Sequence, residues 1–425
     1  MRRDLRLNDQ TALYHALNSS YPVLLLFIFD KAILENLSDK KDIRVTFIHQ
    51  ILEKLNKLLV GKRSSLYVLH DHAIAAMETI CNEFEVKEVF ANHDYEPYSV
   101  DRDTAVREFL GDKHIPFHTY KDQVIFERSE ILKSDGTPYT VYTPYSRIWK
   151  QKYLNQQPET LNSEENLSNL FKTAVFPLPS LNQIGFEKSD PGIHDVTINE
   201  EIILHYQDTR NLPSIDGTSR LGVHLRFGTV SVRELARIAS RLSEQWLNEL
   251  IWREFFMMIL FHFPHVVNRS FKQKYDRLQW RNNEQEFELW CNGETGYPIV
   301  DAGMRQLNAT GWMHNRVRMI VASFLCKHLL IDWRWGEAYF AEKLLDYELA
   351  SNNGNWQWAA GSGCDAAPYF RIFNPTEQMK KFDPRMDYIT TWIKDFTPGY
   401  MPPIVDHDFA RKRALQVYKS SLSAT

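Results

Sequence analysis

The chain has 425 residues, of which 44% are hydrophobic and 13% aromatic. This length predicts two domains, and the composition suffices for a packed core. No apolar run approaches about 18 residues, which argues against a transmembrane helix and leaves VLLLFIF at 23–29 as a buried strand. No secretory signal follows Met1. The four cysteines lack metal-ligand spacing, so we expect reduced thiols, no metal site and a cytoplasmic protein: Cys81, Cys291, Cys326 and Cys364.

The net charge of −4 at pH 7 hides a difference between the two halves of the chain. Residues 1–200 hold 23 Lys or Arg against 29 Asp or Glu, whereas residues 201–425 hold 27 against 25. Ten of the 11 tryptophans lie after residue 245. We therefore expect two domains of different kinds. Any basic patch for nucleic acid must come from folding of the second half, with these candidates: Arg210, Arg316, Lys380 and Lys381.

The first part of the chain alternates between apolar strand patterns and helical periodicity. Strands are expected at 22–30, 64–71, 86–94 and 114–126, with helices at 43–60, 72–84 and 99–111 between them. This order predicts a Rossmann-like parallel sheet with crossover helices, an α/β domain over residues 1–126. Residues 127–195 are richer in Pro, Ser, Asn and Thr and are interpreted as a long inter-domain connection. Residues 196–420 are helical almost throughout, as at 231–262 and 312–330, which predicts an all-α domain.

Residues 346–375 differ from both patterns. They carry two tryptophans one residue apart, three glycines and adjacent asparagines, with no hydrophobic period, so they predict a poor core helix and a poor strand. Glycines allow close approach of the backbone, amides can donate or accept, and indoles can stack. We interpret this segment as the wall of a cavity for a flat aromatic ligand. A Gly-rich loop that caps one helix is the alternative.

Five segments together resemble the photolyase/cryptochrome flavoprotein family, most of all the class I cyclobutane pyrimidine dimer photolyases. They are RRDLRLND at the start, TSRLGVHLRFGTVS (218–231), WLNELIWREFF (246–256), TGYPIVDAGMRQLNATGWMHNRVRM (295–319) and residues 346–375. They occur in the family's order and span nearly the whole chain. The resemblance implies an α/β antenna domain, a helical domain that binds FAD, and light-driven repair of damaged DNA.

The resemblance places the lesion on a helix that carries Glu249 and Trp252. The two are three residues apart and therefore share a face, with Arg253 adjacent. Glu249 is implied to hydrogen-bond a carbonyl of the thymine dimer, and Trp252 to stack on the flipped lesion. Asn315 and Met319, four apart, also share a face and suit a pocket for two fused pyrimidines. By themselves, such pairs are more common as a surface Glu beside a core Trp, for the first, and as helix packing, for the second.

Asn315 and Met319 also bear on the substrate. The (6-4) photolyases of the family carry histidines at both places, because their chemistry needs a proton donor. Asn and Met therefore favour the cyclobutane dimer.

The resemblance also implies a set of FAD-binding residues. Tyr206 and the segment 218–222 match the family's phosphate-binding region, where amides and short hydroxyls suit a pyrophosphate. An ordinary helix cap is the alternative. Arg318 and Asp346 are expected to pair at the flavin edge, and Asn352 to lie near flavin N5, where signalling cryptochromes often have Asp or Cys. The full set is Tyr206, Thr218, Ser219, Arg220, Leu221, Gly222, Trp246, Arg253, Arg318, Asp346, Glu348 and Asn352.

Further matches concern electron transfer and DNA. Trp280, Trp333 and Trp356 match the family's electron relay from surface to flavin, although tryptophans in a helical protein are more often core. Trp358 is expected to face the lesion, like Trp252. Residues at DNA-contacting positions would hold phosphates or the strand near the lesion: Arg210, Arg316 and Gln378.

The chain departs from the family at a few places. Relatives begin with an apolar strand before RRDLRL, so the first strand is expected to be missing here. Gly222 stands where relatives often have Ser, and Glu348 replaces a usual Asp; neither change is expected to abolish FAD binding. Tyr98 and Ser99 replace the Asn-Glu pair of folate-binding relatives, so a deazaflavin, a flavin or no antenna is favoured over folate.

The leading hypothesis is therefore a monomeric deoxyribodipyrimidine photolyase that binds damaged duplex DNA in a prokaryote-like, nucleoid-associated setting. Excited, reduced FAD would donate one electron to split the dimer, without metal or protein nucleophile. A cryptochrome-type photoreceptor without repair activity is the alternative, and a DNA-binding protein with a structural flavin is the third hypothesis.

Overall fold

The computed structural model describes residues 1–189, 196–397 and 399–423. The chain packs as two compact units that interleave along the sequence. The first comprises residues 1–130, 149–198 and 221–240, and the second comprises 131–148, 199–220 and 241–425. The predicted domain boundaries after residues 126 and 195 stay predictions.

The described residues of the first unit form two pairs of parallel strands, and each strand is shorter than predicted. β1 (Leu26–Asp30) pairs with β2 (Tyr67–Asp71), and β3 (Val89–Asn92) pairs with β4 (Phe117–Tyr120). In the described part of the chain, no ladder joins the two pairs. The parallel α/β prediction is confirmed, but a single hydrogen-bonded sheet is wrong for these residues. Strand patterns are local in sequence, whereas pairing depends on distant neighbours.

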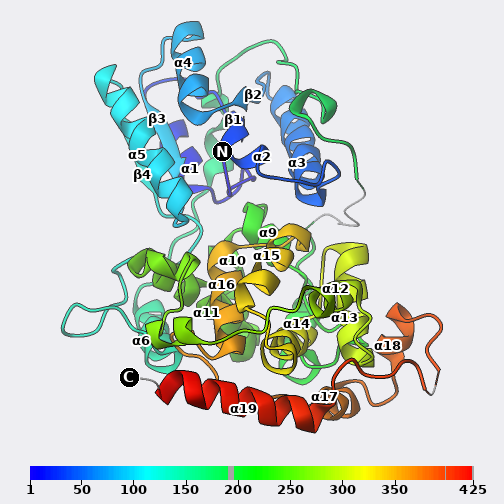
Figure 1. Cartoon of the computed structure of the whole chain (residues 1–425). Coiled ribbons are helices and arrows are strands. Elements are labelled where there is room, and N and C mark those ends of the chain that lie inside the picture. Colours follow the sequence, from blue (N-terminus) through cyan, green and yellow to red (C-terminus); the bar gives the residue numbers. More distant parts are fainter. Residues whose placement is uncertain (190–195, 398, 424–425) are drawn as a thin grey trace. The chain divides into compact units, whose positions relative to one another are not determined.

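Helices flank these strands where periodicity predicted them (Figure 1). They are α3 (Ile43–Val60), α4 (Ala73–Glu83) and α5 (Pro97–Asp112), with the short α1 (Thr11–Leu17) and α2 (Lys31–Leu34) before them. Asp42 begins α3 by accepting a 2.8 Å hydrogen bond from the Arg44 amide. Leu52, Leu55 and Leu59 then lie on its buried face, since they recur at three- and four-residue spacing.

The opening motif RRDLRLND is held by a buried ionic network. Arg6 Nη2 lies 2.8 Å from Asp122 Oδ2, and Arg233 joins Asp122 and Asp9 at 3.0 Å each. Burial opposes ionisation of Asp122, but Arg6 and Arg233 together hold its pKa below the usual value. The network ties residues at the start of the chain to the helix that carries Arg233.

The second unit is helical, as predicted. Three of the helices given next belong partly or wholly to the first unit: α6, α9 and α10. The remaining helices of the chain are α6 (Tyr142–Asn155), α7 (Glu200–Leu204), α8 (Tyr206–Thr209), α9 (Gly222–Phe227), α10 (Val232–Leu242), α11 (Glu244–His262), α12 (Glu284–Asn292), α13 (Pro298–Thr310), α14 (Asn315–Ser323), α15 (Trp333–Lys343), α16 (Leu349–Ala360), α17 (Pro375–Phe382), α18 (Asp387–Trp392) and α19 (His407–Ser423). Short 3₁₀ turns include η4 (Gln273–Arg277), and η5 (Phe324–Leu329) is π-helical.

Two predicted helices are interrupted. The pattern at 231–262 divides into α10 and α11 at Ser243, whose hydroxyl accepts a 3.3 Å hydrogen bond from the Trp246 amide. The pattern at 312–330 begins only at Asn315 and changes from α14 to the π-helical η5 at Phe324. A Ser cap and a change of helix type leave hydrophobic periodicity almost unchanged, so the pattern alone did not show them.

The prediction that residues 346–375 make a poor helix is wrong for residues 349–360, which form α16. This helix is stabilised by packing rather than by propensity. Gly354 allows α16 to approach α11 closely, since a Cβ there would lie 2.2 Å from the Phe256 ring. Asn353 and Gln357 are buried and both donate to the Val266 carbonyl at 3.0 Å. Tertiary contacts therefore override the local pattern.

The largest described core of the second unit is aromatic. Trp290, Trp333 and Trp356 are at most 2% exposed and belong to one cluster of buried residues. The ring centroids of Trp290 and Trp356 are 6.2 Å apart at 71°. Gly336 makes room for Trp356, because a Cβ on Gly336 would lie 2.1 Å from the indole. This core includes the buried residues Trp356, Ala359 and Ala360 of α16, the helix that carries Asn352.

Candidate functional site

Glu249 lies on α11, held from two sides. Its Oε1 accepts hydrogen bonds from Arg210 Nη1 and from Gln245 Nε2, the latter at 3.1 Å. The carboxylate side chain is 32% exposed. Burial raises the pKa of Glu249, and the nearby Arg210 guanidinium opposes this shift. The carboxyl group is thus oriented, and its proton affinity is set by two opposing effects.

Trp252, one turn further along α11, is half-buried and presents only part of its surface. Tyr142 stacks on one face of the indole, with ring centroids 3.6 Å apart and planes 5° apart. The Tyr142 hydroxyl donates to the Asn248 carbonyl at 3.0 Å, and its amide donates to Asp365 Oδ2 at 3.1 Å. Burial, with Glu249 nearby, raises the pKa of Tyr142, so its phenol stays protonated. Tyr142 therefore covers one face of the Trp252 indole and fixes the orientation of its plane.

Asn315 and Met319 lie on α14, as their spacing predicted. Asn315 is the exposed first residue of the helix, and Met319 is half-buried one turn later. Arg316 lies between them and donates to Met319 Sδ at 3.4 Å and to Asn211 Oδ1 at 2.6 Å. Its guanidinium also sits over the Phe382 ring, 4.5 Å from the centroid.

Positive charge converges on His314, at the start of α14. Its Nδ1 accepts a hydrogen bond from the Arg316 amide at 3.1 Å, so the neutral ring carries its proton on Nε2. That buried Nε2 has no partner among the described residues. Burial and four surrounding arginines lower the pKa of His314 to about 4; they are Arg316, Arg318, Arg220 and Arg210. A buried donor and clustered guanidinium groups suit a ligand with negative charge and hydrogen-bond acceptors.

The expected FAD-binding residues of the second unit lie on α8, α11, α14 and α16 and beside them. Tyr206 and Trp246 are buried, at 8% and 4% exposure. Four predicted positions form two buried or partly buried ion pairs: Arg318 with Asp346 at 2.9 Å, and Arg253 with Glu348 at 3.2 Å. The Arg318–Asp346 pair is the one expected from the sequence.

Asn352, expected near flavin N5, is buried on α16. Its Nδ2 donates to the side chain of Glu337 at 2.9 Å and to the Glu337 carbonyl at 3.1 Å. Burial raises the pKa of Glu337, and the hydrogen bond from Asn352 opposes this shift. The amide orientation is therefore set by Glu337, which the sequence did not single out.

The segment 218–222 crosses from one unit to the other. Thr218 and Ser219 are half-buried and Arg220 is exposed, whereas Leu221 and Gly222 lie in the first unit, where Gly222 begins α9. Arg220 has φ +51°, a left-handed backbone that costs energy for a residue with a Cβ. Its guanidinium lies 4.7 Å from the centroid of the Trp312 ring.

The three expected relay tryptophans share one aromatic core. Trp333 and Trp356 are buried in it, and Trp280 is half-buried and packs against it. Trp358 is also half-buried and packs against the same cluster. Gln378, expected to contact DNA, is half-buried on α17.

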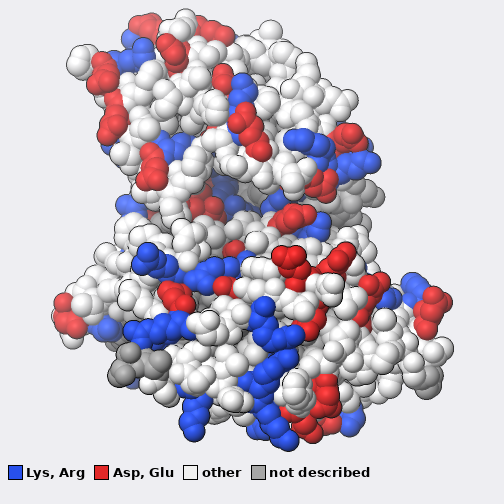
Figure 2. All heavy atoms as spheres, in the orientation of Figure 1, with Lys and Arg blue, Asp and Glu red and all other residues white. Residues whose placement is uncertain are grey.

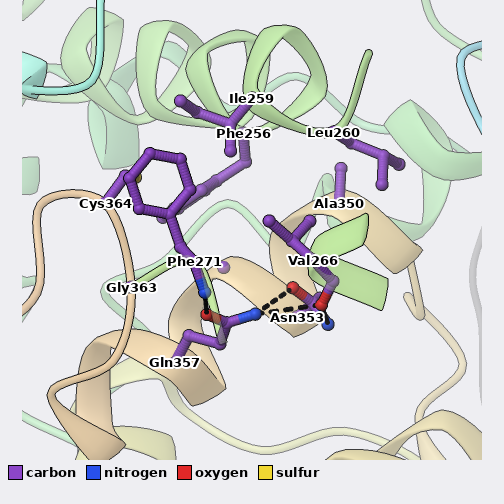
Figure 3. Close-up of a pocket in the computed structure, with 11 residues that line it drawn as sticks. Phe256, Ile259, Leu260, Val266, Phe271, Ala350, Asn353, Gln357, Gly363 and Cys364 are labelled. Carbon is purple, nitrogen blue, oxygen red and sulfur yellow. Dashed lines mark hydrogen bonds between the residues drawn. The ribbon is translucent and has the colours of Figure 1, made fainter. Parts of the chain in front are cut away.

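Part of the segment 346–375 does line a cavity (Figure 3). Figure 3 shows it between α11, α16 and the chain at Gly363 and Cys364, with the apolar side chains of Phe256, Ile259 and Leu260 above Asn353. Its volume of about 20 Å³ is on the scale of one water molecule. This cavity is therefore too small for a flat aromatic ligand, and the interpretation of residues 346–375 as the wall of such a site stays a prediction.

Four site residues were not predicted from the sequence: Tyr142, Gln245, His314 and Glu337. Gln245 lies one helical turn before Glu249, so the i, i+4 spacing could have indicated it. His314 caps α14 and directly precedes Asn315, so it is placed locally. Tyr142 and Glu337 are brought in by tertiary contacts and had no local signal.

The residues present fit FAD. The unpartnered His314 Nε2–H and the surrounding arginines match the acceptors and negative charge of a pyrophosphate.

The described residues hold no group of three or more His, Cys, Asp or Glu placed to bind a metal ion. Among the same residues, no helix is both long and apolar enough to cross a membrane.

Comparisons with known proteins agree with an α/β unit joined to a helical flavin-binding unit. The family model described as DNA photolyase matches residues 1–163, and that described as FAD binding domain of DNA photolyase matches residues 246–398. Deoxyribodipyrimidine photo-lyase of Halobacterium salinarum is 35% identical over 98% of this chain and 98% of the relative. Deoxyribodipyrimidine photo-lyase of Escherichia coli is 36% identical over 99% of this chain and 98% of the relative.

Solved structures agree as well. The class III photolyase of Agrobacterium tumefaciens superposes with a TM-score of 0.88 at 32% identity, covering 100% of this chain and 97% of that one. An archaeal photolyase of Sulfolobus tokodaii, solved with two FAD molecules, superposes with a TM-score of 0.79 at 34% identity. The match covers 99% of this chain and 98% of that one. The fold and site define a flavoprotein of two domains, α/β and all-α.

The chain belongs to the DNA photolyase/cryptochrome family. It is an enzyme, a lyase, and its cofactor is FAD. The family prediction is thus confirmed. The likeness to class I in particular stays a prediction, since a class III photolyase is among the matching structures.

Proposed function

We propose that the chain repairs cyclobutane pyrimidine dimers in duplex DNA, using light and reduced FAD. One observation carries this proposal. Arg210 and Gln245 orient Glu249 one helical turn from the stacked Trp252, and the charge of Arg210 acts on Arg316, which contacts Met319. The relatives of similar length are named deoxyribodipyrimidine photo-lyases, which supports the same substrate.

Glu249 acts on the dimer in this proposal. A carboxyl group can donate a hydrogen bond to a pyrimidine carbonyl only when it is protonated. Burial favours the protonated form of Glu249, and Arg210 favours the charged form. When DNA phosphate engages Arg210, the opposing effect weakens, and Glu249 becomes a better donor to a carbonyl that gains negative charge.

Trp252 supplies the platform for the flipped lesion. One face of its indole is covered by Tyr142, so only the rest of its surface is open to a base. Stacking of a base on such a platform contributes about 1–3 kcal/mol. Trp358, half-buried on α16, supplies a second apolar surface.

Asn315 and Met319 favour the cyclobutane dimer over the (6-4) photoproduct. Neither the amide nor the thioether can act as a general acid near neutral pH. An exposed Asn315 can hydrogen-bond the edge of a pyrimidine, while Met319 offers a soft apolar contact. The site therefore binds a lesion that splits without proton transfer from these positions.

FAD would be held by Tyr206, Trp246, Asn352 and two ion pairs, Arg318–Asp346 and Arg253–Glu348. The expected phosphate segment adds Thr218, Ser219, Arg220, Leu221 and Gly222. When bound and reduced, the cofactor supplies the electron on excitation. Asn352 is oriented by Glu337 and can present its amide to the ring edge. Trp356, Trp333 and Trp280 are proposed to conduct electrons inward from the surface.

DNA would be held by Arg210, Arg316 and Gln378. Burial lowers the pKa of Arg316, and the like charge of the nearby Arg210 lowers it further. Two guanidinium groups this close suit a shared phosphate. We propose that the enzyme is a monomer that acts on DNA in the cytoplasm. For the antenna, a second flavin is the candidate with support, since the Sulfolobus tokodaii structure holds two FAD molecules.

Repair is tested with two duplexes, one carrying a single cyclobutane dimer and one carrying a (6-4) photoproduct. The reduced holoenzyme is incubated with each under blue light and in darkness. We expect restored pyrimidines only for the dimer and only in light. Glu249→Ala should lower the repair yield per absorbed photon while FAD stays bound. Absence of repair by a fully reduced sample would instead favour a cryptochrome-type photoreceptor.

A further inference from the structure

Trp280 lies within a strongly basic surface that the proposed repair reaction does not use. Residues 269–281 and 407–423 together hold nine Lys or Arg and two Asp, a balance of +7 in a chain of net charge −4. The first segment contains η4, and the second is α19. In Figure 2, Lys and Arg gather over the lower part of the helical unit, where α19 runs in Figure 1. We call these two segments the Trp280 basic surface.

The two segments form one surface because aromatic side chains join them. Tyr418 of α19 is fully buried, and its ring lies 6.1 Å from that of Trp280 and 6.3 Å from that of Tyr275. Leu278 and Ala414 complete the same apolar cluster. The basic side chains of η4 and α19 therefore lie around the same packed contact.

Much of this charge faces solvent. Lys274, Arg411, Lys412 and Lys419 are exposed, and no carboxylate is within ion-pair distance of them among the described residues. Arg281 is paired with Glu286 at 2.7 Å, Lys272 is half-buried, and the half-buried Arg413 donates to the His328 carbonyl. Clustered, exposed like charge is unfavourable for the isolated protein and raises the local concentration of anionic partners.

Trp280 connects this surface with the interior. It is half-buried and packs against the core cluster that contains Trp333 and Trp356. An indole is the side chain best suited to exchange an electron at a surface. We propose that the Trp280 basic surface docks an acidic one-electron carrier protein, which returns an electron to Trp280. This inference rests on the relay in the proposed function.

The electron balance is simple. After the relay has passed one electron inward, Trp280 lacks one electron. The carrier gives up one electron and is oxidised by one equivalent, and Trp280 regains its closed shell. The oxidised indole of the partly exposed Trp280 releases its N–H proton to water, and it takes one proton back from water when the carrier returns the electron, so charge and atoms balance.

The dimensions suit a weak, transient complex. At about 1.5 Å per residue, the 17 residues of α19 span roughly 25 Å. Electron-transfer encounters bury less than about 1,200 Å² in total, so α19 and η4 offer enough area. Charge attraction raises the association rate of such pairs by about 10- to 1,000-fold, and salt removes the effect.

The test uses the FAD-loaded enzyme and two carriers of opposite charge: an acidic plant-type [2Fe–2S] ferredoxin and a basic c-type cytochrome. The test variant is Lys274→Glu, Lys412→Glu and Lys419→Glu together. Its control carries the same charge change on exposed lysines of the first unit: Lys57→Glu, Lys62→Glu and Lys113→Glu. Binding is measured in darkness, and recovery of oxidised Trp280 is followed after a light flash.

We expect ferredoxin to bind the natural chain and the control variant alike, with affinity at least tenfold weaker in high salt. The test variant should lose at least tenfold in both ferredoxin affinity and the rate of Trp280 recovery. Its affinity for the cytochrome should rise. Equal ferredoxin binding by test and control variants would overturn the proposal. Loss of affinity for dimer-containing DNA alone would also overturn it and assign the surface to DNA.

Failure of the relay gives a different result. If light produces no oxidised tryptophan, or if Trp280→Phe leaves the signal unchanged, the relay is wrong. The dark measurement with ferredoxin still decides whether the surface docks an acidic protein.

Discussion

Tyr142 is predicted to position Trp252 for the lesion, and its removal should weaken binding of damaged DNA specifically. The two rings stack at 3.6 Å and 5°. An aromatic pair contributes about 0.5–1.5 kcal/mol beyond the area that it buries. Without Tyr142, the indole gains freedom that a bound lesion must remove again. Tyr142→Leu should therefore raise the Kd for a dimer-containing duplex by about 2- to 12-fold, the same free energy expressed as affinity.

Two variants separate the ring from its hydroxyl. Tyr142→Phe keeps the stack and loses only the hydrogen bond to Asn248, so Kd should stay unchanged while stability falls by about 0.5–1.5 kcal/mol. Tyr145→Phe is the matched control, because it removes a buried phenol hydroxyl of the same helix that bonds to Glu254 at 3.3 Å. Stability is measured by denaturant unfolding.

Fluorescence anisotropy measures Kd on duplexes with and without one dimer. If Tyr142 had a purely structural role, its replacement would weaken binding of both duplexes equally, or of neither. The reasoning is refuted if Tyr142→Leu binds the dimer as tightly as the natural chain, or if Tyr142→Phe loses affinity to the same extent as Tyr142→Leu.

Three further predictions concern buried groups. Burial lowers the pKa of Lys327 from 10.5 to about 7, so the unfolded chain binds more protons and stability should rise with pH between these values. From about pH 7.5 to 9.5 this rise amounts to about 2–3 kcal/mol, and it should be absent in Lys327→Met; an equal slope in both would contradict the assignment. Gly336→Ala forces the Trp356 ring to move and should lower the free energy of unfolding by about 1–3 kcal/mol. Gly111→Ala is the control: a Cβ there would meet nothing within 4 Å, so this change should raise the free energy of unfolding. A change of the same sign in both variants would contradict the packing. Arg318→Gln breaks a pair at the proposed flavin edge and should lower the flavin-to-protein absorbance ratio, which an unchanged ratio would contradict.

Much of the local structure could be predicted from the sequence. Helices α3, α4 and α5 follow from apolar residues at helical spacing, and the four strands follow from short apolar runs. The spacing of Glu249 and Trp252, or of Asn315 and Met319, placed each pair on one helix face. Such features depend on residues within one or two turns, and each family motif is likewise a local stretch of chain.

Contacts between distant segments depended on the tertiary structure. Residues 349–360 form a helix only because Gly354 admits the Phe256 ring and Val266 accepts from buried amides. Tyr142 reaches Trp252 from 110 positions away, and Tyr418 reaches Trp280 from 138. A sequence states which side chains can stack, donate or carry charge. Which of them meet is decided by packing, because the free energy of burial depends on all the surfaces that come together and not on their order along the chain.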